Sequence, residues 1–209
     1  MRNILHDPVD KYMTDILPPR DSVVAEMEKY AQLHDVPIVG PAVARLLTLV
    51  TELSGARRIF EMGSAIGYST IWLARAAGPR AKVYYTDGDP ENARRAQEYF
   101  RRAGVTSRIK VQVGNALDLL KREKQPFDII FCDIDKHQYP EAFRISMPRL
   151  KRGGLLIADN TLWSGRVAHK ADSKETRGIQ QFNKMIYAAR NLYPVIVPLR
   201  DGVAVCRKR

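Results

Sequence analysis

The sequence contains little cysteine and no long run of apolar residues. Its two cysteines, Cys132 and Cys206, both fall in apolar stretches typical of strands, which excludes a disulfide framework and a cysteine-rich metal cluster and indicates buried thiols in a reducing compartment. No segment approaches the roughly 18 apolar residues that a membrane helix requires. The opening stretch, MRNILHDPVDKYM, includes no apolar segment long enough for a signal peptide. We therefore expect a soluble, cytoplasmic protein that does not insert into a membrane.

Negative charge is also scarce in this chain. The 23 Asp and Glu residues are outnumbered by 34 Lys and Arg residues, so the 209 residues carry a formal net charge of +11. A charge of this sign attracts nucleic acid, membrane headgroups or acidic substrates. The basic residues occur in short clusters such as Arg94-Arg95 and Arg101-Arg102, several of them on the expected polar face of a helix. Nucleic-acid binding surfaces are usually contiguous stripes, so these clusters favour an ordinary solvated surface.

Residues 1–56 are predicted to be helical. Asp21 and Ser22 are N-cap candidates for a helix that ends near Leu33, and Pro41 opens a second helix that ends just before Gly55. The apolar side of this second helix is expected to consist of Leu46, Leu47, Leu49, Val50 and Leu53.

From Arg57 onward, strand patterns alternate with helical ones. Strands are predicted over Arg58–Met62, Lys82–Asp87, Ile109–Val113, Phe127–Asp133 and Leu155–Asp159, and longer helices over about Tyr68–Ala77, Pro90–Gly104 and Thr176–Ala189. Repeated β-α units predict an α/β fold with a mainly parallel sheet and helices on both faces. Asp201-Gly202 then separates Val195–Arg200 from Val203–Arg207, which predicts a hairpin whose last strand runs antiparallel to its neighbour. Because no repeat or linker divides the chain, we expect one domain over residues 1–209.

The turn after the first strand is a candidate ligand site. Glycines at 63 and 67 allow close approach of a ligand to the backbone, and the following helix offers free N–H groups to an anion. A dinucleotide fingerprint needs a second glycine where Ser64 stands, which weakens an NAD interpretation. The carboxylate of a methionine moiety is a smaller anion that tolerates this difference. A tight structural turn without a ligand remains an alternative.

Two polar residues at later strand ends extend this candidate site. Asp87 lies 20 residues after Gly67, where an acid accepts hydrogen bonds from ribose hydroxyls. A turn or cap residue in Asp87-Gly88-Asp89-Pro90 is the alternative, and Asp89 is the better candidate for the cap. Asn115, after the third strand, is equally compatible with lining an adenine edge and with an ordinary turn.

Three oxygen donors follow the fourth and fifth strands. Asp133 ends one strand, and Asp159 and Asn160 end the next, at the sheet edge where ligands bind in open α/β folds. An all-oxygen set of this kind suits Mg²⁺, Mn²⁺ or Ca²⁺ rather than zinc, and it leaves about three of six octahedral positions for a substrate and water. The alternative is that Asp159 and Asn160 only begin a loop.

Lys136, three residues after Asp133, adds a candidate base to this set. Methyl transfer to oxygen requires an oxyanion, and a phenol-like hydroxyl of pKa about 10 costs roughly 4 kcal/mol to ionise at pH 7. A bound cation stabilises the anion, and a nearby lysine can take the proton. The alternative is that Lys136 is one more surface lysine.

Three stretches of the chain resemble the motifs of the cation-dependent O-methyltransferases, the class I S-adenosylmethionine-dependent family that includes the catechol and caffeoyl-CoA O-methyltransferases. They are Glu61–Thr70, Asp133–Lys136 with Tyr139, and Asp159–Val167, and the likeness runs from about Asp10 to Gly202. The resemblance implies a Rossmann-like class I methyltransferase fold. That fold has a seven-stranded, mostly parallel sheet, a C-terminal antiparallel hairpin, and helices on both faces. The helices of residues 1–56 would then pack on the core and cover the cofactor site.

The resemblance also implies roles for individual residues. Asp133, Asp159 and Asn160 would bind the cation, and Lys136 would act as the base. S-adenosylmethionine contacts are implied for Val39, Glu61, Gly63, Ser69, Asp87, Ala116 and Asp133. A homodimer is implied as well. The chain departs from the family at Asn115, where bacterial relatives carry an acid, and over Ile186–Leu192, which lacks an acid often found near the substrate.

These observations lead to one principal hypothesis and three alternatives. The principal hypothesis is an S-adenosylmethionine-dependent, divalent-cation-dependent O-methyltransferase acting on a hydroxyl of a catechol-like or phenolic small molecule. The positive charge motivates the first alternative, the same chemistry on 5-hydroxyuridine in tRNA. An NAD-dependent oxidoreductase and a non-catalytic basic binding module are the others.

Overall fold

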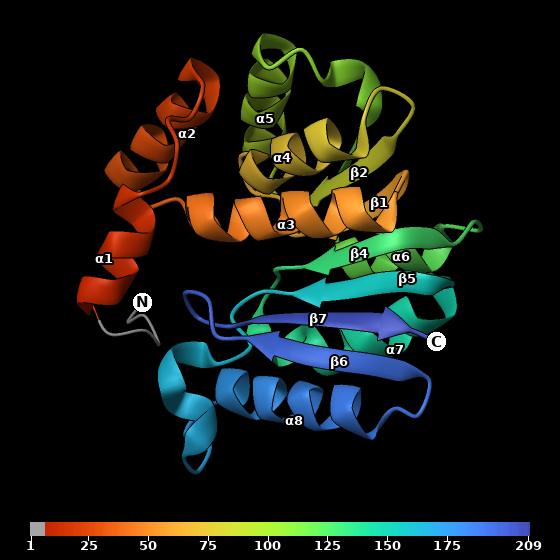
Figure 1. Ribbon diagram of the computed structural model, residues 1–209. Helices are drawn as coiled ribbons and strands as arrows, with labels where there is room; N and C mark the ends of the chain where they lie inside the picture. The colour runs from red at the N-terminus through yellow and green to blue at the C-terminus, as the bar shows by residue number, and fades with distance from the viewer. Residues whose placement is uncertain (1–6) are drawn as a thin grey trace.

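The computed structural model describes residues 7–209, which form one seven-stranded sheet between two layers of helices (Figure 1). The strand order is β3-β2-β1-β4-β5-β7-β6. This is the Rossmann-like arrangement that the sequence predicts. From β1 the strands are added toward one edge of the sheet as far as β3, and from β4 they are added toward the other edge. The sequence analysis expects no signal peptide in the opening stretch, and Met1–His6 of that stretch lie outside the described residues. Among residues 7–209, no helix combines the length and apolar character that a membrane span requires.

Three helices precede the sheet: α1 (Asp7–Asp15), α2 (Ser22–Leu33) and α3 (Gly40–Ser54). Asp21 caps α2 as predicted, because its carboxylate accepts the backbone N–H groups of Val23 and Val24. Gly55 ends α3 in the left-handed conformation.

The predicted apolar side of α3 is partly wrong. Leu49 and Leu53 are 52% and 78% exposed, while the helix buries a stripe that includes Val43, Ala44 and Leu47. The stripe continues to Thr51 in the last turn, and Leu46 and Val50 are partly buried against the core. Two of the leucines in its second half are left at the surface.

The remaining elements alternate as expected. The strands are β1 (Arg58–Met62), β2 (Lys82–Asp87), β3 (Ile109–Val113), β4 (Phe127–Cys132), β5 (Leu150–Ala158), β6 (Leu192–Val197) and β7 (Val203–Lys208). The helices are α4 (Tyr68–Ala77), α5 (Pro90–Arg102), α6 (Ala116–Arg122), α7 (Tyr139–Arg149) and α8 (Lys174–Ala188), with 3₁₀ turns η1 (Thr106–Arg108), η2 (Lys136–Gln138) and η3 (Trp163–Ala168). Strand β5 begins five residues before its predicted start. Its end and both bounds of each of β1–β4 agree with the prediction within one residue.

The C-terminal hairpin is confirmed in direction but not in its turn. β7 runs antiparallel to both β5 and β6. β6 ends at Val197, which pairs with Val203, so residues 198–202 form a five-residue connection in place of the predicted two-residue turn. Tertiary contacts override the local Asp-Gly signal here, because Asp201 is almost fully buried against another loop.

Successive side chains of a strand point to opposite faces of the sheet, so the buried apolar residues form two layers, one on each face. In β1, Ile59 packs toward α3–α5 and Phe60 toward α6–α8, and each belongs to a separate cluster of buried side chains. Both cysteines are buried and free, as predicted, and burial raises the pKa of each thiol to about 12. Because the sheet is covered on both faces, a ligand reaches it at the carboxyl ends of the strands.

Candidate active site

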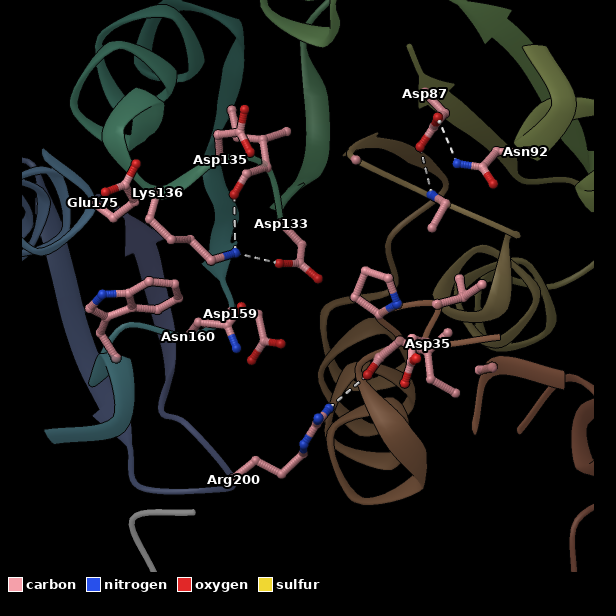
Figure 2. A pocket seen from close by; sticks show the side chains of 18 of the residues that line it. Asp35, Asp87, Asn92, Asp133, Asp135, Lys136, Asp159, Asn160, Glu175 and Arg200 are labelled. Carbon is pink, nitrogen blue, oxygen red and sulfur yellow. Dashed lines mark hydrogen bonds and ion pairs between the residues drawn. The ribbon is translucent and has the colours of Figure 1, made fainter. Parts of the chain in front are cut away.

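A cavity of about 820 Å³ opens at the carboxyl ends of the central strands (Figure 2). It lies where the strand order reverses between β1 and β4, the position at which open α/β sheets bind ligands. Six of the predicted site residues line it: Gly63, Asp87, Asp133, Lys136, Asp159 and Asn160. The fold thus brings the glycine turn and the predicted cation site into one space.

The turn between β1 and α4 requires its two glycines. Gly63 and Gly67 have φ angles of 80° and 83°, which side-chain-bearing residues rarely adopt. A Cβ atom on Gly63 would overlap the carbonyl oxygen of Asp133, and one on Gly67 would overlap the ring of Phe100. The turn is therefore packed tightly against both β4 and α5.

Glu61 lies beneath this turn and is fully buried. The hydroxyls of Ser64, at 2.9 Å, and Thr70 donate to its Oε2, while Oε1 has no partner among the described residues. Burial raises the pKa of Glu61 to about 7, and the hydroxyls that donate to its carboxylate act against this rise. Glu61 therefore holds the turn through its hydrogen bonds to Ser64 and Thr70, and its Oε1 has no partner among the described residues.

Asp87 connects the glycine turn to α5. Its Oδ2 accepts the N–H of Ala65 at 2.9 Å, and its Oδ1 accepts the N–H of Asp89 at 2.8 Å and the Asn92 amide at 3.2 Å. Asp89 is the N-cap of α5, as predicted, and accepts the N–H of Glu91. Asp87 therefore acts as a turn residue while it also faces the cavity, so the two interpretations of this acid are compatible.

Asn115 is the N-cap of α6. Its Oδ1 accepts the N–H groups of Leu117 at 2.9 Å and Asp118 at 3.2 Å, which supports the turn interpretation. Among the residues described, those that line the cavity do not include Asn115. The same holds for four residues with an implied cofactor contact, which are buried: Val39, Glu61, Ser69 and Ala116.

At the other end of the cavity, Asp133 follows β4, and Asp159 and Asn160 follow β5. Asp159 is 2% exposed, and its Oδ1 has no hydrogen-bond partner among the described residues. Burial and the neighbouring charge of Asp133 raise the pKa of Asp159 to about 7. Figure 2 shows Asp159 and Asn160 side by side, below Asp133 and Lys136.

These three residues fit a hard divalent cation. The described residues contain no group of three His, Cys, Asp or Glu side chains placed to hold a metal, so the amide of Asn160 would have to complete the set. All the donors are oxygens, one carboxylate oxygen of Asp159 is buried without a partner, and the two carboxylates repel each other. A cation such as Mg²⁺ or Mn²⁺ would relieve both the unsatisfied oxygen and the repulsion.

Lys136 is buried, so the surface-lysine alternative is wrong. Its Nζ pairs with Asp133 Oδ1 at 2.7 Å and donates to the Ile134 carbonyl at 3.0 Å and the Tyr139 hydroxyl at 3.1 Å. Burial lowers the pKa of Lys136, but the charge and hydrogen bond of Asp133 outweigh it and raise the pKa overall. The ammonium group is thus held at the rim of the predicted cation site.

Sequence reasoning missed several residues of the cavity wall. Residues 35–38, between α2 and α3, lie along it together with Glu28, Trp163, Glu175 and Arg200. Arg200, on the β6–β7 connection, reaches across the site and donates from Nη1 to the carbonyl oxygen of Ile38 at 2.9 Å (Figure 2). Except for Trp163, which lies on the loop after β5 and within the Asp159–Val167 motif, these residues do not follow a strand of the parallel core, so no local pattern associates them with the site.

The charge of the cavity is opposite to that of the chain. Seven acidic and two basic side chains line it: Glu28, Asp35, Asp87, Asp133, Asp135, Asp159 and Glu175, with Lys136 and Arg200. Within a protein of net charge +11, this pocket favours cationic ligands over polyanions.

Comparison with known proteins agrees with this geometry. The sequence model of a family described as O-methyltransferase matches residues 20–209. The chain is 34% identical to the catechol O-methyltransferase of Niastella koreensis, covering 98% of each protein. It is 31% identical to the catechol O-methyltransferase of Mycobacterium tuberculosis, covering 80% of this chain and 77% of that protein.

Solved structures share the whole fold. The O-methyltransferase from Bacillus cereus, in complex with SAH, has a TM-score of 0.87 and 29% identity over 97% of both chains. TomG from Streptomyces achromogenes, an O-methyltransferase involved in tomaymycin synthesis and solved with SAM, has a TM-score of 0.87 and 27% identity over 96% of both chains. The chain therefore belongs to the class I O-methyltransferase family, as its motifs predict, and it is an O-methyltransferase.

Proposed function

We propose that this enzyme transfers the methyl group of S-adenosylmethionine to a hydroxyl of a catechol-like or phenolic small molecule and requires a divalent cation. The observation that carries the proposal is the buried, unpartnered Oδ1 of Asp159, beside Asn160 and Asp133 in the cavity that also contains the glycine turn. The names of the two catechol O-methyltransferase relatives and the SAH and SAM complexes of the two structural relatives support it.

The cofactor is proposed to occupy the half of the cavity next to the glycine turn. Val39, Glu61, Gly63, Ser69, Asp87, Ala116 and Asp133 are the proposed contacts. The unsatisfied Oε1 of Glu61 suits a cationic or hydrogen-bond-donating group, and the acidic lining favours the positive sulfonium. The start of α4 offers its free N–H groups to a carboxylate.

The acceptor is proposed to occupy the other half, next to Lys136 and Trp163. Asp133, Asp159 and Asn160 would hold Mg²⁺, with Mn²⁺ or Ca²⁺ as substitutes. When bound, the cation would supply positive charge that offsets part of the roughly 4 kcal/mol needed to ionise a phenolic hydroxyl at pH 7. Lys136 is the proposed base. Its ammonium form cannot take a proton, so a cation bound at Asp133 would first have to offset the charge that raises the Lys136 pKa, and the neutral Nζ would then receive the hydroxyl proton.

Two substitutions test this assignment with labelled S-adenosylmethionine, catechol and Mg²⁺. Asp159→Ala should abolish turnover and Mn²⁺ binding measured by calorimetry, while it leaves SAH binding intact. Lys136→Met should lower kcat by about 10²–10⁴-fold and leave SAH binding unchanged. The exposed Lys184→Met is the matched control and should keep full activity. Full turnover in excess chelator would contradict the cation requirement.

Of the three alternative functions considered from the sequence, two are wrong and one stays a prediction. Membership of the O-methyltransferase family makes the oxidoreductase and the non-catalytic binding module wrong. Methylation of 5-hydroxyuridine in tRNA stays a prediction, and the acidic cavity opposes it. A tRNA acceptor would require affinity that falls steeply with salt. Methyl transfer to catechol, with no tRNA binding at low salt, would eliminate that acceptor.

We further propose a cytoplasmic homodimer in which residues 1–209 act as one domain and the N-terminal helices cover the cofactor site. Val9 and Tyr12 on α1 and Ile16 just after it are 48%, 64% and 61% exposed, and Leu49 and Leu53 are exposed on α3. Exposed large apolar side chains are candidates for a protein interface. Light scattering during size-exclusion chromatography should give twice the chain mass, and a monomeric mass would contradict the dimer.

A further inference from the structure

Arg200 is a half-buried cation on the cavity wall that the proposed chemistry does not use. It lies on the connection between β6 and β7, and its side chain extends toward the connection between α2 and α3 (Figure 2). Its Nη1 donates to the Ile38 carbonyl oxygen at 2.9 Å. The side chain therefore joins two connections that are distant in the chain at one cavity.

The guanidinium also packs over the start of α3. Gly40, the first residue of that helix, has a φ of 71°. A Cβ atom on Gly40 would lie 3.4 Å from Nη1 of Arg200 and 3.7 Å from its Cζ. Arg200 therefore contacts both the end of the α2–α3 connection and the first residue of the helix that follows.

Residues 35–40, here called the α2–α3 segment, have a backbone that needs such contacts. Asp35 has a φ of 52°, so both ends of the segment lie in the left-handed region. A non-glycine residue in this region is uncommon and persists where its surroundings determine the conformation. The N–H of Val36 donates to the Ala31 carbonyl at 3.0 Å and holds the first part of the segment to α2. Arg200 holds the second part from the other side of the cavity.

The α2–α3 segment faces the glycine turn across the cavity. Val36, Pro37 and Ile38 line the same space as Gly63 and Ala65. Val39, the next residue, is a proposed cofactor contact and is the N-cap of α3, without a side-chain hydrogen bond to the helix. A segment that is already in place spares the ligand the cost of ordering it, and this raises the affinity for that ligand.

We infer that Arg200 is a positioning residue that fixes the α2–α3 segment against the cofactor half of the cavity and thereby slows release of the cofactor. The inference rests on the proposed function, because it assumes that the cofactor lies between the glycine turn and Val39. Hydrogen bonds from a charged donor are about twice as strong as neutral ones. Loss of one such bond typically changes an equilibrium constant by about 10–100-fold, so Arg200 can act without touching the cofactor.

The first test is SAH binding by two variants that lack the guanidinium. Arg200→Met keeps the apolar part of the side chain, and Arg200→Gly suits the φ of 50° at this position. Both should bind SAH about tenfold more weakly in calorimetry and release it faster in stopped-flow measurements. Arg152→Met, at an exposed arginine near the amino end of β5, is the matched control and should bind SAH normally. Wild-type SAH affinity in either Arg200 variant would overturn the inference.

The second test is hydrogen exchange, which shows where the variants change. Peptides that cover residues 35–40 should exchange faster in Arg200→Met than in the wild type, while those of α6 should not change. Such a local change separates a positioning role from a general loss of stability. If SAH binding weakens without faster exchange in the α2–α3 segment, or if both Arg200 variants fail to fold, the inference is wrong. Absence of SAH binding by the wild-type protein would instead refute the proposed cofactor site.

Discussion

The Tyr139 hydroxyl connects the ends of the two strands that precede the proposed cation ligands. The ring is fully buried against Phe182. The hydroxyl donates to the Asp159 carbonyl oxygen at 2.8 Å, with the Cys132 carbonyl oxygen at 3.3 Å, and it accepts from Lys136 Nζ at 3.1 Å. One oxygen atom therefore links β4, β5 and the candidate base. Tyr139→Phe removes that oxygen and keeps the ring.

The expected effect on stability follows from these contacts. The substitution leaves a buried carbonyl oxygen without its donor and removes one of the three hydrogen bonds of Lys136, which costs about 1–3 kcal/mol. For a chain of this length, Tm falls by about 2–4 °C per kcal/mol. Because the ring still fills its space, no cavity cost adds to this. Denaturant unfolding should show a lower midpoint with an unchanged slope.

Function should change more selectively than stability. The ends of β4 and β5 would be less firmly placed relative to each other, so Mn²⁺ affinity should fall about tenfold, while SAH binding at the glycine turn should not change. The control is Tyr193→Phe, at an exposed tyrosine on β6 that should alter neither quantity. A Tyr139→Phe protein with wild-type unfolding midpoint and wild-type Mn²⁺ affinity would refute this account of the hydroxyl.

Two further predictions concern the sheet and the glycine turn. Asp128 accepts the N–H groups of Arg57 and Arg58 and pairs with Lys151; burial alone would raise its pKa, but these partners outweigh burial and lower it. A carboxyl with a lowered pKa in the folded state stabilises above its unfolded pKa of about 3.9, so Asp128→Asn should cost about 1–3 kcal/mol at pH 7. That difference should shrink as urea unfolding is repeated from pH 5 to pH 3, and a constant difference would contradict it. Gly63→Ala should weaken S-adenosylmethionine binding in calorimetry at least tenfold, because its Cβ overlaps the carbonyl of the residue after β4. Gly55→Ala is the control: it has a similar φ of 62° but open space around it, so it should lower stability and leave cofactor binding unchanged.

The sequence by itself determined the elements and the residues whose chemistry is local. The bounds of β1, β2, β3 and α4, the caps at Asp21 and Asp89, and the positive-φ glycines of the turn agree with the structure because periodicity and turn geometry depend on near neighbours in the chain. The convergence of Asp133, Asp159 and Asn160 was also predictable. In a parallel sheet, the carboxyl ends of adjacent strands meet at one edge.

Only the tertiary structure decided the features that depend on distant contacts. Lys136 becomes a buried residue because α8 packs over η2, with Gly178 close to the backbone of Lys136. Arg200 joins the cavity through a hydrogen bond to Ile38, 162 residues away in the chain. Asp201 leaves the expected two-residue turn because burial against the loop of residues 159–165 outweighs local turn preference. No local period encodes these contacts, since each depends on which surfaces meet after the sheet has formed.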